Sequence, residues 1–162
     1  MALPDISLAL QSFQQALNAG ELSPLPGTLD EQLFLHVDRP GDDVRLTYVR
    51  LDGRTVTALI QFIPVEPIDG EVCFGVGWAV PEALRGQGRA GEAFLAAVRE
   101  MRHGFRTKME SFWLEGIVSA ENVASQRLAA RVISASPTPS VDGEAGVPVL
   151  QYLRHFDAST QL

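Results

Sequence analysis

The stretch Arg85-Gly86-Gln87-Gly88-Arg89-Ala90-Gly91 decides the fold, because it joins an expected strand to the clearest helical pattern in the chain. Glycines let a backbone approach a ligand closely, and a helix start presents unpaired amides and the positive end of its dipole. Arg85 and Arg89 add positive charge at the same place. The loop therefore predicts an anion site. The alternative interpretation is a turn that uses glycine for its backbone freedom.

Helices and strands are expected around this loop from the spacing of apolar residues. Helical spacing predicts helices over 6–17 with Asp5 as the N-cap, over 90–105, and over 122–133. The capping box Thr28-Leu-Asp-Glu31 predicts a further helix that ends before Pro40. Alternating and β-branched segments predict strands over 45–51, 55–64, 71–80, 112–118 and 147–156. This order indicates an α/β (α+β) fold, a mixed and mostly antiparallel central sheet of about six to seven strands flanked by helices.

Composition excludes several classes of protein. With 162 residues, 46% hydrophobic and 20% charged, the chain is long enough for one domain and too apolar to be disordered. No apolar run approaches the roughly 20 residues of a membrane span. No secretory signal is recognised at the N-terminus, and the lone Cys73 predicts no internal disulfide, so we expect a cytoplasmic protein. A pI near 4.9 argues against nucleic-acid binding.

Charge is divided unevenly along the chain. Residues 1–80 hold eleven acids and four bases, a net charge of −7, whereas residues 81–162 hold nine of each. The segment 85–108 carries six bases against two acids. The division fits a phosphate-bearing ligand in the second half and a cationic ligand near the first, although charge runs are commonly solvated faces. The acids expected around the second helix are Asp30, Glu31, Asp38, Asp42 and Asp43.

The loop also matches the dinucleotide fingerprint Gly86-x-Gly88-x-x-Gly91, but its position argues against a dehydrogenase. In a dinucleotide domain the first glycine follows its strand directly and further βαβ units come after. Here residues 81–84 intervene, and the chain beyond the expected helix over 90–105 holds one more helix and terminal strand material.

Two motifs together resemble the GNAT (Gcn5-related N-acetyltransferase) superfamily. Arg85-x-x-Gly88-x-Ala90 is similar to its acyl-CoA pyrophosphate loop, and Asn122-x-x-Ser125-x-x-Leu128 to its next helix. The surrounding residues most resemble the branch that includes ribosomal-protein N-terminal acetyltransferases. The close resemblance covers about residues 71–133. It implies a single domain over 1–162, with acceptor-side helices and meander in 1–80, an acyl-CoA-binding core in 81–133 and C-terminal strands in 134–162.

The resemblance implies acetyl-CoA as cosubstrate and a set of residues that bind it. The strand end would pair with the pantetheine arm, the loop amides would hold the pyrophosphate, and Asn122 would bond the pantetheine or cap its helix. The implied cofactor-binding residues are Trp78, Ala79, Val80, Arg85, Gly86, Gln87, Gly88, Arg89, Ala90, Asn122 and Ser125.

Catalytic side chains depart from the family pattern. The tyrosine that many members place seven residues after the asparagine is Ala129 here, so the resemblance assigns Ser125 as proton donor, with local backbone bonding as the alternative. The glutamate that the branch often carries on the strand before the loop is Gly75. Glu71 is then the nearest carboxylate for a base acting through water. Glu115, on the facing strand, is an alternative candidate for this base, on an equal footing with Glu71.

Other reactive residues carry weaker predictions. Cys73 has no histidine partner in the sequence and is expected to be buried packing. The three histidines make no metal spacing, and His36, at the end of the expected second helix, is a weak candidate for the acceptor rim.

The motifs indicate two alternative functions. The first is an N-acetyltransferase that moves an acetyl group to a primary amine of a cationic small molecule or a protein N-terminus. The alternative is a non-catalytic acyl-CoA-binding or protein-interaction module. A final strand with Val147, Val149 and Leu150 indicates a possible homodimer.

Overall fold

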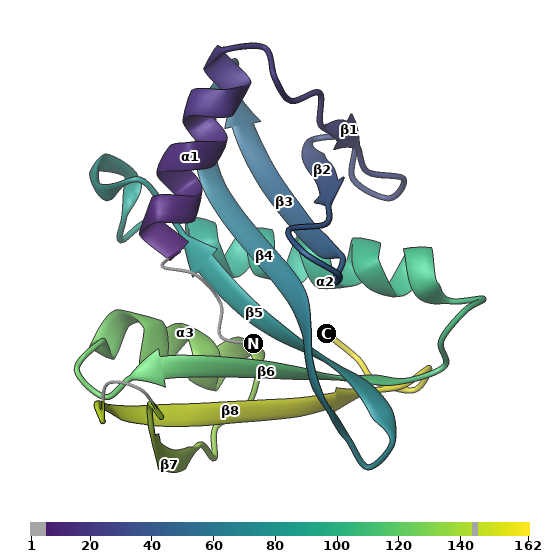
Figure 1. Cartoon of the computed structure of the whole chain (residues 1–162), viewed down its shortest axis with the longest axis vertical. Coiled ribbons are helices and arrows are strands. Elements are labelled where there is room, and N and C mark those ends of the chain that lie inside the picture. The colour runs from purple at the N-terminus through teal and green to yellow at the C-terminus, as the bar shows by residue number, and fades with distance from the viewer. Residues whose placement is uncertain (1–5, 144–145) are drawn as a thin grey trace.

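A single eight-stranded sheet forms the centre of the protein (Figure 1). The computed structural model describes residues 6–143 and 146–162. The strand order is β1-β2-β3-β4-β5-β6-β8-β7, in which β5 and β6 run parallel and the other neighbours run antiparallel. The strands are β1 (Leu25–Pro26), β2 (Leu33–Asp38), β3 (Arg45–Asp52), β4 (Thr55–Ile68), β5 (Glu71–Ala79), β6 (Phe112–Ser119), β7 (Thr138–Val141) and β8 (Pro148–Phe156).

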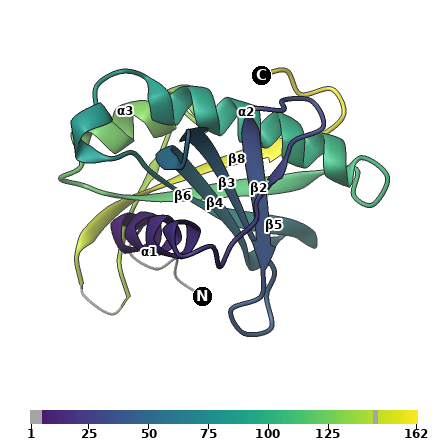
Figure 2. The ribbon, with the colours of Figure 1, turned by 90° about the horizontal axis from the view of Figure 1, so that it is seen from above.

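Helices cover both faces of this sheet. Figure 2 shows α1 (Ile6–Asn18) on one face, and α2 (Arg89–Phe105) and α3 (Val123–Val132) on the other. The main core lies between the sheet and α2, where the ring centroids of Phe62 and Phe94 are 6.4 Å apart. A second cluster lies under α1, around Phe13 and Leu17. The expected fold class, a mixed and mostly antiparallel sheet flanked by helices, is confirmed. None of the helices in the described ranges is long and apolar enough to cross a membrane.

The three helices with the clearest apolar periodicity form within a residue or two of their expected bounds. Each buries one stripe, such as Ala93, Phe94 and Ala97 on α2. The expected N-cap Asp5 lies outside the described residues.

The expected second helix is wrong, since the segment after Thr28 becomes a bend followed by β2. The carboxylate of Glu100, which projects from α2, accepts hydrogen bonds from the amides of Thr28 and Leu29, at 3.0 Å and 2.9 Å for Leu29. Asp30 accepts hydrogen bonds from the amides of Gln32 and Leu33. These tertiary and turn contacts satisfy the amides of Thr28, Leu29, Gln32 and Leu33 without a helix, and His36 lies on β2.

The sheet has eight strands, more than the six to seven expected. Three of the eight lie outside the five segments that the sequence predicts as strands, namely β1 and β2, which form in place of a helix, and the exposed β7, which contains Pro139. β7 pairs with β8 at Val149 and Leu150. The edge through which a dimer was expected to pair is therefore already occupied at these residues. The sequence Asp142-Gly-Glu-Ala-Gly146 predicts a turn before β8, and this segment falls partly outside the described residues.

Candidate functional site

The parallel strands β5 and β6 pair only briefly and then separate (Figure 1). Their register joins Cys73 to Trp113, Phe74 to Leu114 and Gly75 to Glu115. Beyond this point β5 continues on β4 as far as Ala79, while β6 continues on β8 as far as Ser119. The two facing strand edges thus open a gap in the middle of the sheet. Open backbone edges offer hydrogen bonds to an extended ligand.

The glycine loop follows β5 at the open end of this gap. Gly86 and Gly88 have φ of 76° and 74°, the left-handed region that glycine adopts without strain. Gly88 is the N-cap of α2 and has no side chain to bond the amides of the first helical turn. Those amides point out of the helix start, together with the positive end of its dipole. The local geometry is that of an anion site.

A cavity of about 500 Å³ lies between this loop, the end of β5 and the start of α3. Of the predicted cofactor-binding residues, Gln87 alone is not part of its lining; its side chain accepts a hydrogen bond from Arg89 Nε at 3.2 Å. The described lining contains three arginines and no acid. The predicted residues that line the cavity are Trp78, Ala79, Val80, Arg85, Gly86, Gly88, Arg89, Ala90, Asn122 and Ser125.

A second cavity of about 120 Å³ occupies the gap itself. It is lined from β5 by Val76, Gly77 and Trp78, and from β6 by residues 117–119. Because successive strand residues point to opposite faces, this lining includes residues from both faces of the sheet. Trp78, Asn122 and Ser125 border both cavities, so they mark the junction between the anion site and the gap.

At the junction, the indole N–H of Trp78 donates a hydrogen bond to Ser125 Oγ at 3.2 Å. The Trp78 ring also packs edge-on against Phe94 of α2, with centroids 6.0 Å apart. A hydroxyl that accepts one hydrogen bond keeps its own hydrogen to donate elsewhere. The arrangement leaves the hydroxyl hydrogen of Ser125 available for a hydrogen bond beside the gap.

Asn122 caps α3. Its Oδ1 accepts a hydrogen bond from the Ser125 amide at 3.0 Å, and the side chain is exposed at the cavity rim. The capping role is thus occupied, and the amide group remains at the junction. This bond also fixes the backbone of Ser125.

The larger cavity also has lining residues that the sequence did not predict, among them Ile6, Ser7 and Arg131. Ile6 and Ser7 come from the start of α1, and Arg131 comes from α3. A Cβ atom on Gly91 would lie 2.8 Å from a guanidinium nitrogen of Arg131, so α2 and α3 pack closely there. Arg131 follows Asn122 by nine residues and therefore lies late in the same helix. The sequence alone contains no signal that this side chain lies near the loop.

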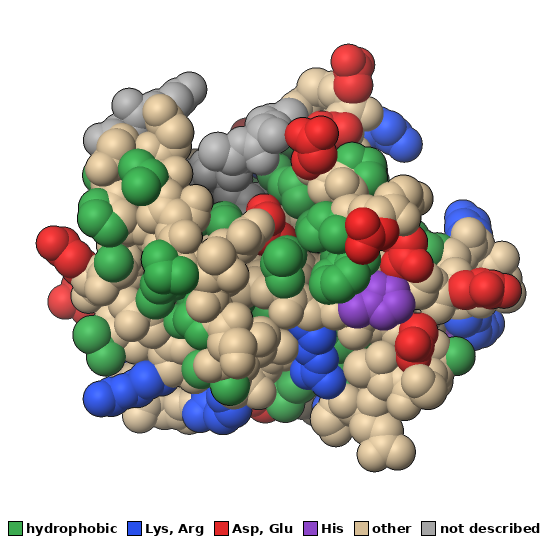
Figure 3. Space-filling model, turned by 90° about the horizontal axis from the view of Figure 1, so that it is seen from below, with side chains coloured by type: hydrophobic (Ala, Val, Ile, Leu, Met, Phe, Trp, Pro, Cys, Tyr) green, Lys and Arg blue, Asp and Glu red, His purple; other side chains and the backbone are tan. Residues whose placement is uncertain are grey.

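Glu71 is not brought to Ser125. It begins β5, about 23 Å along the strand from Trp78. Its Oε2 lies 2.6 Å from His155 Nε2, and the His155 ring packs in a tilted arrangement against Trp113, with ring centroids 4.9 Å apart. Figure 3, a view from below, shows acidic side chains gathered beside a histidine. The contacts make Glu71 part of a hydrogen-bonded pair with His155 at the far end of the strand.

Cys73 is buried, as expected, and burial followed by the nearby Glu115 carboxylate raises its pKa to about 12. A thiol held protonated is a poor nucleophile. His36 contacts Phe13 of α1 with ring centroids 6.0 Å apart. No group of three or more metal-ligating side chains occurs in the described part of the chain.

The acids expected to attract a cationic acceptor are partly paired. Arg50 binds Asp30 at 2.7 Å and also contacts Glu92, and the bond from Arg50 lowers the pKa of Asp30. Arg45 and Asp38 form two parallel bonds. These carboxylates are therefore largely neutralised by their own neighbours.

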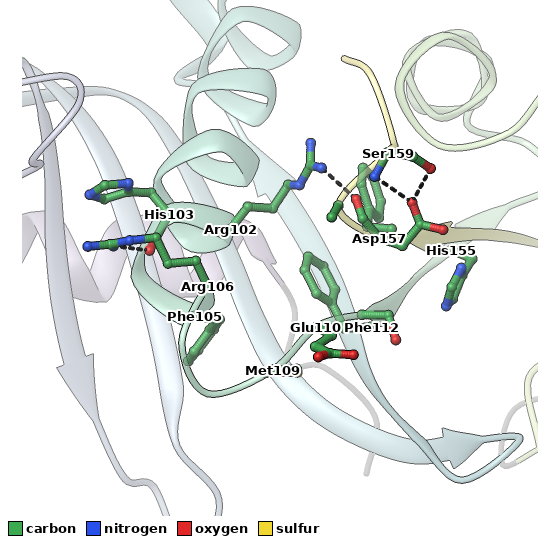
Figure 4. Close-up of a pocket in the computed structure, with 13 residues that line it drawn as sticks. Arg102, His103, Phe105, Arg106, Met109, Glu110, Phe112, His155, Asp157 and Ser159 are labelled. Atoms are coloured by element: carbon green, nitrogen blue, oxygen red, sulfur yellow. Dashed lines mark hydrogen bonds between the residues drawn. The ribbon is translucent and has the colours of Figure 1, made fainter.

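A third cavity, of about 830 Å³ and larger than the other two, lies elsewhere, between the end of α2 and the end of β8 (Figure 4). Its cations do not converge: Arg102 donates to the Asp157 carbonyl at 2.7 Å, and Arg106 donates to the His103 carbonyl. Figure 4 shows His103 and Arg106 directed away from Asp157 and His155. Size alone does not make it the better candidate.

Comparison with known proteins gives matches in structure only. No family model matches the sequence, and no curated protein matches it. Among solved structures, the RimL ribosomal L7/L12 alpha-N-protein acetyltransferase in complex with coenzyme A matches with a TM-score of 0.51 and 20% identity. That match covers 71% of this chain and 64% of RimL.

Two further structures match with similar scores. The ribosomal-protein-S5-alanine acetyltransferase from Vibrio fischeri has a TM-score of 0.52 and 9% identity, over 74% of this chain and 64% of that one. NAA60 from Arabidopsis thaliana, in complex with a bisubstrate analogue, has a TM-score of 0.50 and 17% identity, over 74% and 79%. The chain spans just under two thirds of the length of the first two proteins. It has the fold of these acetyltransferases, the GNAT fold that its two motifs indicate.

Proposed function

We propose that this chain with a GNAT fold is an acyl-CoA-dependent N-acetyltransferase that transfers an acetyl group to a primary amine. The observation that carries the proposal is the junction at Trp78 and Ser125, where the cationic cavity meets the gap between β5 and β6. An acyl-CoA has the matching parts, an anionic pyrophosphate and a long, extended arm that ends in a thioester.

The residues fit the anionic part of such a molecule. A Cβ atom added at Gly86 or Gly88 would meet no protein atom within 4 Å, so open space lies beside both backbones. The amides at the start of α2 face this space, with Arg85, Arg89 and Arg131 around it. Phosphate oxygens bind well where helix amides and guanidinium groups converge. We assign this part of the cavity to the pyrophosphate.

The gap fits the arm. Trp78, Ala79 and Val80 would offer backbone groups to an extended amide-containing chain, as an added strand does. Asn122 and Ser125 border the same passage. The thioester supplies the activated acetyl group, and the chain's own residues must admit a neutral amine and return a proton to the leaving thiolate. Ser125 is assigned the second task.

Calorimetric titration with acetyl-CoA tests the proposal, with CoA and NAD titrated in parallel. Micromolar binding of acetyl-CoA, worth about −8 kcal/mol, is the expected result. The double variant Arg85→Ala/Arg89→Ala should bind about 10- to 100-fold more weakly, because charge-assisted phosphate contacts are lost. Arg106→Ala, at the other end of α2, is the matched control. A folded protein that does not bind acetyl-CoA would overturn the assignment.

Turnover is measured separately, with acetyl-CoA and a panel of amines that includes spermidine, an aminoglycoside and short peptides with free N-termini. Release of CoA with any of them supports a transferase. Tight binding without turnover across the panel would favour the non-catalytic acyl-CoA-binding module instead.

A further inference from the structure

Glu115 stands at the point where β5 and β6 separate. It is the register partner of Gly75 in the last pair that joins the two strands. In a parallel pair, opposed residues point to the same face, and alternation places Gly75 and Gly77 on the face opposite to Trp78. Neither glycine carries a side chain, so the surface of β5 beside Glu115 is bare at the mouth of the gap.

The carboxylate of Glu115 is held in place. Gln151 of β8 donates from Nε2 to Glu115 Oε2 at 2.7 Å, which leaves Oε1 for another donor. Glu115 is partly exposed, and its charge acts on Cys73. The other titratable groups that alternation places on this face of β5 and β8 are Glu71 and His155, and they pair with each other. The Glu71–His155 pair therefore does not involve Glu115, and Glu115 Oε1 can accept another hydrogen bond.

The gap connects the two faces of the sheet. The cavity of about 500 Å³, where an acyl-CoA is proposed to bind, lies at the starts of α2 and α3 and is bordered by Ile6 and Ser7 of α1. The smaller cavity passes between the strands with lining residues from both faces. On β5 the lining of the cavity of about 120 Å³ begins at Val76, the residue after Gly75, so Glu115, the register partner of Gly75, lies next to the closed end of the gap. Gly75, which is level with Glu115, lies about 10 Å along β5 from Trp78, which bonds Ser125. An amine hydrogen-bonded to Glu115 and a thioester hydrogen-bonded to Ser125 would fill this distance.

We propose that Glu115 is a catalytic residue, which binds the acceptor as an ammonium ion and takes one proton from it. This assignment rests on the proposed function. One N–H proton passes to Glu115 Oε1, and the freed nitrogen lone pair forms the C–N bond as the C–S bond breaks. The thiolate takes the Ser125 hydroxyl proton, and a second N–H proton restores the hydroxyl. The products are an N-substituted acetamide, CoA thiol and a protonated Glu115 that releases its proton to water.

The test compares the wild type with Glu115→Gln on an amine that the wild type acetylates. The isosteric variant should keep its fold and its acetyl-CoA affinity, and its kcat/KM near pH 7 should fall about 100-fold or more. The deficit should shrink as pH rises, because more of the amine is already neutral in solution. A purely structural defect would lower the rate equally at every pH. Glu110→Gln, an acid beyond the end of α2, is the control.

Each result decides the assignment. A Glu115→Gln enzyme with wild-type kcat/KM and an unchanged pH profile would overturn it while the transferase stands. The same conclusion holds if Glu71→Gln shows the pH-dependent loss instead. A wild type that binds acetyl-CoA but acetylates none of the amines would overturn both the assignment and the transferase, and failure to bind acetyl-CoA would do so one step earlier.

Discussion

The indole N–H of Trp78 on β5 donates to the hydroxyl of Ser125 on α3 at 3.2 Å, 47 residues apart in the sequence. The bond fixes the position of the Ser125 oxygen and leaves its hydrogen to point away from the ring. It also ties α3 to the strand edge that bounds the gap. Trp78 is in this sense a positioning residue for Ser125.

Removing the hydroxyl should slow the chemical step without weakening cofactor binding. Ser125→Ala is expected to lower kcat about 100-fold, the usual contribution of a positioned proton donor. Trp78→Phe keeps an aromatic ring on Phe94 but loses the N–H, so a smaller fall in kcat is expected, with a stability loss of about 1 kcal/mol. Steady-state kinetics and acetyl-CoA titration measure the two effects. Unchanged kcat in Ser125→Ala would remove the serine from the mechanism.

The backbone of the loop should tolerate no side chain at Gly88. Its φ of 74° costs an alanine about 1 kcal/mol, and the added methyl group enters the proposed phosphate space. Gly88→Ala should therefore lower both the free energy of unfolding and the affinity for acetyl-CoA.

Gly104→Ala is the matched control within α2. Gly104 lies inside the helix without a positive φ and with open space around it. Alanine there should stabilise the protein by about 0.5–1 kcal/mol. Urea unfolding with unchanged m-values compares the two variants. Equal effects of both substitutions would contradict the strained geometry at Gly88.

Glu100 should be a large single contributor to stability. Its buried carboxylate accepts the amides of Thr28 and Leu29 and holds the bend before β2. Glu100→Ala leaves these donors unpaired, so a loss of about 2–4 kcal/mol is expected in urea unfolding. Glu100→Gln keeps one acceptor oxygen and should lose less. A loss below about 0.5 kcal/mol for Glu100→Ala would show that water replaces the carboxylate.

Alkaline pH should destabilise the protein through Cys73. Its pKa is raised from 9.0 to about 12 by burial and then by Glu115. The thiol ionises first in the unfolded chain, so the folded state loses relative stability as pH rises from about 9 toward 12. Cys73→Ala should flatten this part of the pH dependence of the free energy of unfolding. An equally steep decline in Cys73→Ala would assign it to other groups.

The same thiol reports on Glu115 without any turnover assay. Removing the carboxylate charge in Glu115→Gln should lower the Cys73 pKa, which the pH dependence of the thiolate ultraviolet absorbance of the folded protein measures. No change in that pKa would mean that the two side chains do not interact as described.

The sequence predicted the local geometry of the glycine loop and of the α3 cap well because the signals for both are local. Gly86, Gly88 and Asn122 act through their own backbone angles or through a cap three residues away, so their order along the chain is sufficient. The Thr28 segment failed for the opposite reason. Its amides are satisfied by Glu100, 72 residues away for Thr28, a contact that no local pattern contains.

The carboxylates show a second limit. Strand alternation places Glu71 and Gly75 on one face of β5, but it gives no distance from the gap. The register of β5 on β6 supplies that information: Glu115 lies at the fork, and Glu71 lies four residues before Gly75. Arg131 was missed because its approach to Gly91 depends on how two helices pack.

The short ladder between β5 and β6 also has a mechanical meaning. Three residue pairs fasten the side of the sheet that carries α1 to the side formed by β6, β8 and β7. Beyond these pairs, β5 and β6 are not paired with each other. A long ligand that binds in that gap and forms hydrogen bonds to both strands would join the two sides of the sheet. Binding at the site is therefore expected to strengthen the contact between them.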